Sequence, residues 1–212
     1  MIDVYNGGFV VWNGVYGDIN LIKFIFRSYF LLFYKVKVTG LENIPQEGGL
    51  IMACNHMSNF DPPFAGGFAG KKRDSIYFIK KELMSVPVCG WLFKYFGFIP
   101  VDRKKPGGDM GAIKAALKVV KKGESLFIFP EGTRSKTGKP GRAKPGIGFM
   151  VYHSGAPVLP IKITNTNKLP FTRRLSVTFG KPFKVEKDPQ REVKEQFQEF
   201  ADKVMEEINK LD

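Results

Sequence analysis

The sequence predicts an α/β fold: a single layered domain with a mixed, largely parallel sheet flanked by helices, preceded by an N-terminal membrane-interfacial helix. Short apolar runs of strand length alternate with stretches of helical periodicity, which is typical of strand–helix–strand units. The 212 residues are enough for one domain with its own core. The chain contains no internal repeat and no low-complexity tract.

Seven segments are predicted as strands because they are continuously apolar or alternate apolar with polar residues: 35–39, 50–54, 75–79, 98–101, 125–129, 158–163 and 175–179. Helices are expected to begin at Pro62 and Pro63 and to cover 82–96, 109–122 and 146–154, with a bend or break at Pro87 and Gly90.

A further helix is expected at the C-terminus, with Asp188 as its cap and Pro189 at its first position. Its apolar side chains recur at helical spacing and should dock on the body of the protein. They are Val193, Phe197, Phe200, Val204, Ile208 and Leu211.

Residues 19–34 (INLIKFIFRSYFLLFY) predict an amphipathic helix with an unusually wide apolar arc. Lys23 and Arg27 interrupt the run, so a helix lying in the membrane interface, with these two side chains near phosphates, fits better than a spanning one. The alternative is an ordinary helix packed on the domain. We therefore divide the chain into an N-terminal segment, 1–34, and a main domain, 35–212. Residues 1–20 lack the pattern of a secretory signal and suggest no role.

The chain is strongly basic, with a formal net charge of +13, although the segment from Glu186 onward holds nine acidic and five basic residues. Such a body attracts nucleic acid, an anionic membrane surface or phosphorylated ligands. Cys54 and Cys89 form no CxxC pair, which fits a reducing compartment. The two histidines and two cysteines have no metal-ligand spacing, and His153 stands alone, so we expect no metal and no cofactor.

Three features are open to two interpretations each. The twenty Phe residues indicate either apolar surface for lipid or a Phe-rich core. The apolar segment 83–98 is either core or, as we favour, the wall of a tunnel for a long apolar chain. The basic segment 134–144 (RSKTGKPGRAK) is either a solvated loop or a contact for anionic headgroups or acidic acyl carrier protein.

The segment 55–61 (NHMSNFD) carries the first chemical motif, a His and an Asp separated by four residues directly after a predicted strand. Pro62 makes Asp61 the natural cap of the following helix, where its carboxylate stays ionised. A loop between them lets His56 donate one ring N–H to Asp61 and keep the other nitrogen as a general base. Alone, the spacing is equally compatible with a loop histidine and a plain helix cap.

Two further motifs also follow predicted strands. Residues 129–135 (FPEGTRS) offer Glu131 as an acceptor, Gly132 for tight backbone geometry, and Thr133 and Arg134 as donors. Residues 97–103 (GFIPVDR) put Arg103 at the end of another strand, and arginine is well suited to bind a phosphate through two hydrogen bonds. Strand-end loops are where α/β folds bind ligands.

These three motifs, with APVLPI at 156–161, resemble the four ordered blocks of the glycerolipid acyltransferase family, and most of all the bacterial 1-acyl-sn-glycerol-3-phosphate (lysophosphatidic acid) acyltransferases. The likeness runs from about residue 35 to 181 and includes LENIPQEGG, IKKEL and GKP. It does not extend to the first twenty residues.

The resemblance implies transfer of a fatty acyl group from an acyl thioester, on acyl carrier protein or coenzyme A, to the sn-2 hydroxyl of 1-acyl-glycerol-3-phosphate, giving phosphatidic acid. His56 is then the base and Asp61 its partner. The implied substrate-binding residues are Lys80, Arg103, Glu131, Gly132, Thr133 and Arg134, with Pro157 and Pro160 shaping the pocket wall. The implied setting is the cytoplasmic face of the cell membrane, with peripheral or monotopic attachment.

The residues themselves support direct attack by the substrate hydroxyl, because Ser58 lies in no nucleophile elbow and Cys54 belongs to a buried type of strand. Alternatives are another lysophospholipid or glycerol-3-phosphate as acceptor, a thioester hydrolase, and an inactive lipid-binding relative, against which the intact His–Asp pair argues. Nucleic-acid binding is not expected, because the aromatic residues cluster in apolar runs instead of alternating with basic ones.

Overall fold

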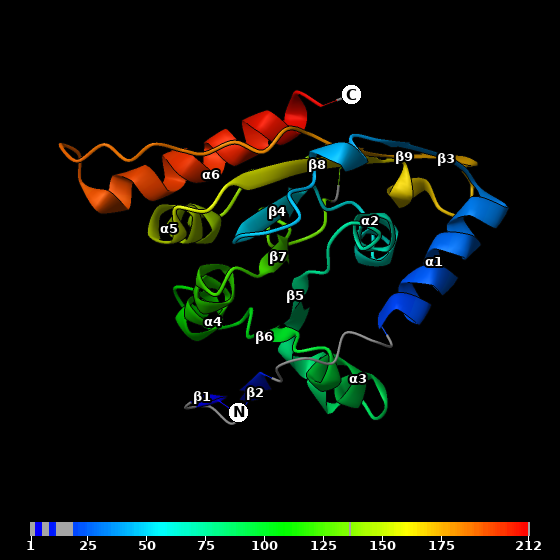
Figure 1. Ribbon diagram of the computed structural model, residues 1–212, viewed down its shortest axis with the longest axis horizontal. Coiled ribbons are helices and arrows are strands. Elements are labelled where there is room, and N and C mark those ends of the chain that lie inside the picture. The colour runs from blue at the N-terminus through cyan, green and yellow to red at the C-terminus, as the bar shows by residue number, and fades with distance from the viewer. Residues whose placement is uncertain (1–2, 6–8, 12–18, 136, 212) are drawn as a thin grey trace.

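A seven-stranded sheet forms the centre of the molecule (Figure 1). The computed structural model describes residues 3–5, 9–11, 19–135 and 137–211. Across the sheet the strands follow the order β3 (Lys35–Thr39), β9 (Arg174–Phe179), β8 (Val158–Thr164), β4 (Leu50–Cys54), β7 (Ser125–Ile128), β5 (Ile76–Lys80) and β6 (Ile99–Val101). All neighbouring pairs are parallel except β8 and β9, which are antiparallel. The predicted fold class is confirmed, and every predicted strand is present to within one residue at each end.

The central strand β4 explains why the sheet needs helices on both faces. All five of its residues are buried, and successive side chains of a strand point to opposite faces. Leu50, Met52 and Cys54 join one apolar core, whereas Ile51 and Ala53 join a second. Cys54 is therefore a core side chain, and burial raises the pKa of its thiol well above the usual value.

Helices cover the two faces separately (Figure 1). One face packs against α1 (Ile19–Phe33) and α2 (Asp61–Ala69), and the other packs against α4 (Met110–Lys121), α5 (Pro145–Ser154) and α6 (Val193–Asn209). The predicted break near Pro87 is confirmed, because a 3-10 turn (Lys81–Ser85) precedes the short α3 (Cys89–Tyr95). Other 3-10 turns are Leu41–Asn43 and Thr166–Lys168.

The C-terminal helix docks as predicted but begins later. Its first residue is Val193, not Pro189, because the Asp188 carboxylate accepts the N–H of Gln190 in a tight turn before the helix. The side chain of Gln196 then bonds the backbone N–H and C=O of Asp188 and holds this turn against α6. In the predicted apolar face, Val193 is consequently 40% exposed, whereas Phe200 is buried.

Contact between α5 and α6 depends on a glycine. A Cβ atom on Gly148 would lie only 1.7 Å from the carbonyl oxygen of Phe197, so the two helix backbones touch at this point. The ring of His153 packs on Phe149 and Phe197 in the same contact, and burial lowers its pKa. His153 is thus part of this helix contact.

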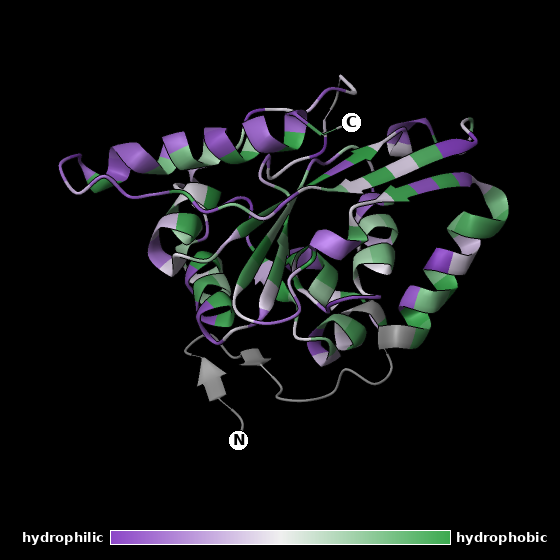
Figure 2. Cartoon of the chain, turned by 45° about the horizontal axis from the view of Figure 1, so that its top comes forward, coloured by the Kyte–Doolittle hydropathy of each residue, from purple (hydrophilic) through white to green (hydrophobic). Residues whose placement is uncertain are grey.

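Helix α1 is confirmed as a helix, but its orientation differs from the interfacial arrangement that we expected. Lys23 points inward, where it forms an ion pair with Asp74 and its stem packs against Gly70, so it does not reach outward toward phosphates. Phe30 is fully buried against Phe64 of α2. The outward face is apolar. Helix α1 lies at the edge of the molecule, and its ribbon in Figure 2 is mostly green with some purple bands. Its exposed members are Leu21, Phe24, Ile25, Phe26, Tyr29, Leu31, Leu32 and Phe33.

Near the N-terminus, β1 (Asp3–Tyr5) and β2 (Phe9–Val11) pair as a small antiparallel sheet that the sequence analysis did not predict. Within the described ranges, every helix is too short or too polar to cross a membrane.

Candidate active site

One edge of the sheet collects the predicted site residues. Strands β4, β7, β5 and β6 are adjacent and parallel, so their carboxyl ends meet at the same edge. His56 follows the end of β4, Glu131 follows β7, Lys80 ends β5 and Arg103 follows β6. Residues far apart in the sequence are brought to the position where open parallel sheets bind ligands.

His56 and Asp61 form the predicted pair. The Nδ1 atom of His56 lies 2.8 Å from Oδ2 of Asp61, and both side chains are buried. Because a carboxylate only accepts hydrogen bonds, Nδ1 carries the proton, and Nε2 is left with a lone pair. The geometry is that of a general base with its orienting carboxylate.

Asp61 reaches this position in a different way from the predicted helix cap. Helix α2 begins at Asp61 itself, and the carboxylate turns back to accept the backbone N–H groups of Met57 and Ser58 at 2.5 and 2.7 Å. The reason is that Pro62 and Pro63 have no N–H to donate, so a capping carboxylate would find too few partners in the first turn. The double proline therefore frees Asp61 to organise the His56 loop. Its second oxygen, Oδ1, is buried and has no hydrogen-bond partner among the described residues.

The imidazole of His56 is also supported from the side. It stacks on the ring of Phe129, with 4.0 Å between ring centroids and 22° between planes. The backbone carbonyl of His56 accepts the N–H of Ser135 at 2.8 Å. Sequence reasoning included Phe129 in the FPEGTRS motif but assigned it no function. The available signal was the position of Phe129 at the start of that motif.

Glu131 links two loops. It is buried, and its two oxygens accept the backbone N–H groups of His56 at 2.8 Å and Gly141 at 2.7 Å. The side chain thus holds the His56 loop against the loop that follows β7. Its predicted contact with the acceptor stays a prediction, and Gly141 is a partner that sequence reasoning missed.

The remaining predicted residues are more open. Arg103, Thr133 and Arg134 are exposed, and neither arginine has an ion-pair partner in the part of the chain that the structure describes. Lys80 is half exposed, with its Nζ 3.8 Å from Oε1 of Glu82. Gly132 adopts a positive φ of 67°, which glycine accepts without strain. The carboxyl edge of the sheet that carries His56 therefore also carries these exposed cationic groups.

These motifs can be compared with known proteins. The acyltransferase family model matches residues 35–164, which is more than half of the chain. The chain belongs to the acyltransferase family. The matched range contains every residue that the sequence analysis assigned to the site.

Several members of the acyltransferase family are similar in sequence. The chloroplastic 1-acyl-sn-glycerol-3-phosphate acyltransferase of Brassica napus is 36% identical over 139 residues, covering 65% of this chain and 39% of that protein. The 1-acyl-sn-glycerol-3-phosphate acyltransferase of Borreliella burgdorferi is 33% identical over 145 residues, covering 66% of this chain and 55% of that protein. The Pseudomonas aeruginosa protein of the same name is 34% identical over 128 residues, covering 60% and 48%. The chain thus spans about half the length of the curated relatives it matches.

A solved acyltransferase has the same fold. The crystal structure of the 1-acyl-sn-glycerophosphate acyltransferase PlsC from Thermotoga maritima aligns with a TM-score of 0.67 and 26% identity. The alignment covers 91% of this chain and 80% of that one. The match extends beyond the motifs to almost the whole described fold.

Proposed function

We propose that this acyltransferase moves a fatty acyl group from an acyl thioester to the sn-2 hydroxyl of 1-acyl-glycerol-3-phosphate, giving phosphatidic acid. The observation that carries the proposal is the His56–Asp61 pair, with 2.8 Å between Nδ1 and Oδ2, at the carboxyl edge of the sheet. The activity named for the Brassica, Borreliella, Pseudomonas and Thermotoga relatives supports the choice of substrates.

In the proposed reaction, Nε2 of His56 takes the proton of the acceptor hydroxyl as its oxygen attacks the thioester carbonyl carbon. The tetrahedral intermediate collapses with cleavage of the C–S bond, and the thiolate leaves and receives the proton held by His56. Asp61 stabilises the imidazolium formed in between. General-base catalysis of this kind contributes about 10²–10⁴ in rate.

No acyl-enzyme is needed for this reaction, and the surroundings of the two nearby nucleophiles support its absence. Cys54 is fully buried in the core beside α2, and burial raises the pKa of its thiol, so little thiolate forms. The Ser58 hydroxyl accepts the backbone N–H of Phe60 at 3.3 Å and makes no hydrogen bond with His56 among the described residues. Direct attack by the substrate is the simpler route.

The cationic groups at the edge suit the substrate phosphate. We assign Arg103 and Arg134 to the phosphate of the acceptor, since each guanidinium is exposed and has no ion pair in the described ranges. Lys80 and the Gly132–Thr133 turn are assigned to the phosphate or to the oxyanion that develops on the thioester carbonyl. Glu131 is assigned chiefly to the position of the His56 loop.

Aromatic rings lead away from His56 and support a path for an acyl chain. Phe129 contacts Phe127 with ring centroids 5.5 Å apart, Phe127 contacts Tyr77 at 5.0 Å, and Tyr77 contacts Phe98 at 5.3 Å. Phe98 then stacks on Phe93 of α3 at 5.6 Å. We propose that the acyl chain lies along these aromatic side chains toward the 83–98 segment.

We further propose peripheral attachment to the cytoplasmic face of the cell membrane through the outward face of α1. Exposed side chains such as Leu21, Ile25 and Leu32 would otherwise contact water, and the basic body suits an anionic leaflet. The donor is acyl carrier protein or coenzyme A, and the basic loop 134–144 is a candidate contact for acidic acyl carrier protein or for headgroups. Nucleic acid is not a proposed partner.

The test is an assay of the purified full chain with both thioester donors and a panel of acceptors, in which the lipid product and the released thiol are both measured. Phosphatidic acid formed only with 1-acyl-glycerol-3-phosphate supports the proposal. Equal thiol release without any acceptor would indicate a thioester hydrolase instead. Preferred use of glycerol-3-phosphate or another lysophospholipid would overturn the acceptor assignment.

A further inference from the structure

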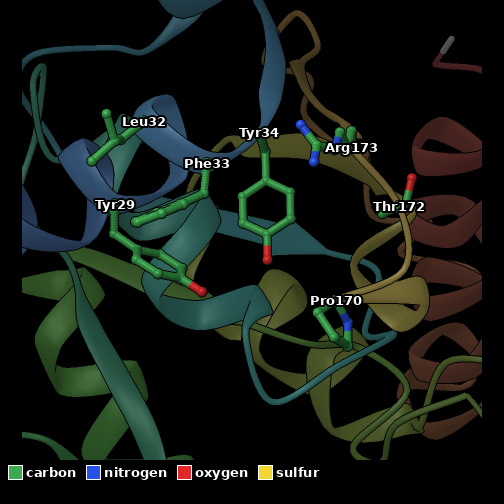
Figure 3. A pocket seen from close by; sticks show the side chains of 7 residues that line it. All are labelled: Tyr29, Leu32, Phe33, Tyr34, Pro170, Thr172 and Arg173. Atoms are coloured by element: carbon green, nitrogen blue, oxygen red, sulfur yellow. The ribbon is translucent and has the colours of Figure 1, made fainter.

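A pocket lies away from the His56 site, where the end of α1 meets the turn before β9 (Figure 3). Its volume is about 320 Å³. The side chains of Tyr29, Phe33 and Tyr34 surround it on one side, and the 170–173 turn closes the other. The complete lining is Tyr29, Leu32, Phe33, Tyr34, Pro170, Thr172 and Arg173. None of these residues belongs to the catalytic motifs.

The pocket lies at the same edge of the sheet as His56, although on different strands. Strand β8 is parallel to β4, with Ile161 opposite Cys54, and antiparallel to β9, with Thr164 opposite Ser176. The amino ends of β9 and of its parallel neighbour β3 therefore lie at the edge where β4 ends. A membrane surface that contacts the pocket can therefore also lie opposite His56.

The charges around this pocket lack a counter-charge. Segments 24–41 and 165–181 contain seven basic residues and no acidic one. Lys35 and Arg174 are paired in register on β3 and β9, and like charges at such positions repel each other. In the described part of the chain, Lys35, Arg173 and Arg174 are exposed and form no ion pair. An external anion would stabilise this cluster.

The rim of the pocket is strongly apolar at the same time. Phe171 is 94% exposed and lies between the lining residues Pro170 and Thr172. Across the pocket, Leu32 is 77% exposed and continues the apolar outward face of α1. Large apolar side chains next to unpaired cations are typical of surfaces that sit at the boundary between headgroups and acyl chains.

We propose that this pocket binds the headgroup phosphate of an anionic bilayer phospholipid, with Arg173 at the phosphate, while Phe171 and the outward face of α1 insert among the acyl chains. The inference rests on the proposed membrane attachment through α1 and adds a second, lipid-binding contact to it. The 170–173 turn adds a contact away from the axis of α1, and such a contact resists rotation about that axis. The bound lipid thus turns the catalytic edge toward the bilayer that holds the acceptor.

The test measures binding of the full chain to vesicles of pure phosphatidylcholine and of phosphatidylcholine mixed with phosphatidylglycerol. Phe171→Ala should require about tenfold more lipid for half-maximal binding on both kinds of vesicle, because an inserted apolar side chain is lost. Arg173→Gln should weaken binding about fivefold on the anionic vesicles only. Matched controls at the start of α6, Val193→Ala, and just before it, Arg191→Gln, should bind like the parent protein.

Two further measurements separate this proposal from the proposed function. Ile25→Ser removes an exposed side chain of α1 that does not line the pocket. If it weakens vesicle binding while Phe171→Ala and Arg173→Gln bind like the parent, α1 remains the anchor and the lipid site is wrong. Transfer to a soluble short-chain acceptor should stay at the parental rate in Phe171→Ala and Arg173→Gln. A loss of that transfer would mean that the variants damage the enzyme itself, and it would overturn the assignment of these residues to lipid binding.

Discussion

The carboxylate of Glu131 accepts the backbone N–H of His56 at 2.8 Å, so the loop after β7 holds the His56 loop after β4 in position. The other oxygen of Glu131 accepts the N–H of Gly141, and the whole group is buried. A buried carboxylate with two backbone donors is a strong positional constraint, because hydrogen bonds to ionised groups are stronger than neutral ones.

Glu131→Gln tests whether this contact positions the base. The amide can accept one of the two N–H groups but turns an N–H₂ toward the other, so the His56 loop should loosen. We expect kcat to fall, the acceptor KM to change little, and the free energy of unfolding to drop by about 1.5–3 kcal/mol. Steady-state kinetics and urea unfolding measure these quantities. A raised acceptor KM with unchanged stability would instead make Glu131 a direct substrate ligand.

His56→Ala should remove nearly all transfer, since no other described base lies beside Asp61. Asp61→Asn should lower kcat by up to about 10⁴, by analogy with catalytic triads, because the amide cannot stabilise the imidazolium. Circular dichroism of both variants serves as the folding control. Transfer by His56→Ala at the parental rate would show that the base is a different residue.

The acceptor phosphate can be probed by exchanging Arg103 or Arg134 for Lys. Lysine keeps the charge but loses the planar pair of donors, so the KM for 1-acyl-glycerol-3-phosphate should rise while the KM for the thioester changes much less. Arg142→Lys is the matched control, because Arg142 pairs with Asp202 of α6. If both variants keep the parental acceptor KM, the phosphate binds elsewhere.

Cys54→Ser should retain substantial activity. The thiol is fully buried on the α2 side of β4, and burial raises its pKa, so it contributes packing instead of a nucleophile. The buried hydroxyl costs about 1–3 kcal/mol of stability, which thermal unfolding can measure. Complete inactivity in a normally folded protein would reopen the covalent route.

Membrane binding is best tested by substitution in α1, since deletion of residues 1–34 would also remove Phe30 from the core. Replacing Leu21, Ile25 and Leu31 together with Ser should weaken binding to anionic vesicles at least about 100-fold. High salt alone should weaken binding less, because it screens charge and leaves apolar insertion intact.

The matched comparison for α1 is a triple Ser variant at Leu83, Val86 and Trp91, three of the exposed apolar residues around the 3-10 turn and α3. Unchanged binding is expected for this variant. Release from vesicles by this variant, with the α1 variant still bound, would move the anchor to the 83–98 segment.

The sequence by itself determined the strands of the seven-stranded sheet and the positions of the site motifs. Apolar runs such as 50–54 and the helical spacing of 109–122 depend on local patterns of side chains, so each strand of that sheet and most helices are readable without the fold. NHMSNFD is equally local: His56 and Asp61 are close in the chain, and the double proline sets the start of α2.

Tertiary structure decided what depends on distant partners. Gln196 bonds the backbone of Asp188, and α6 begins after this turn. The ion pair with Asp74 keeps Lys23 on the inner side of α1, so the apolar face of the helix lies outside. The antiparallel pairing of β8 with β9 brings the 170–173 turn to the catalytic edge. The link from Glu131 to His56 joins residues 75 positions apart. Such contacts depend on which surfaces meet after the chain folds, and the spacing of residues along the sequence contains no measure of that.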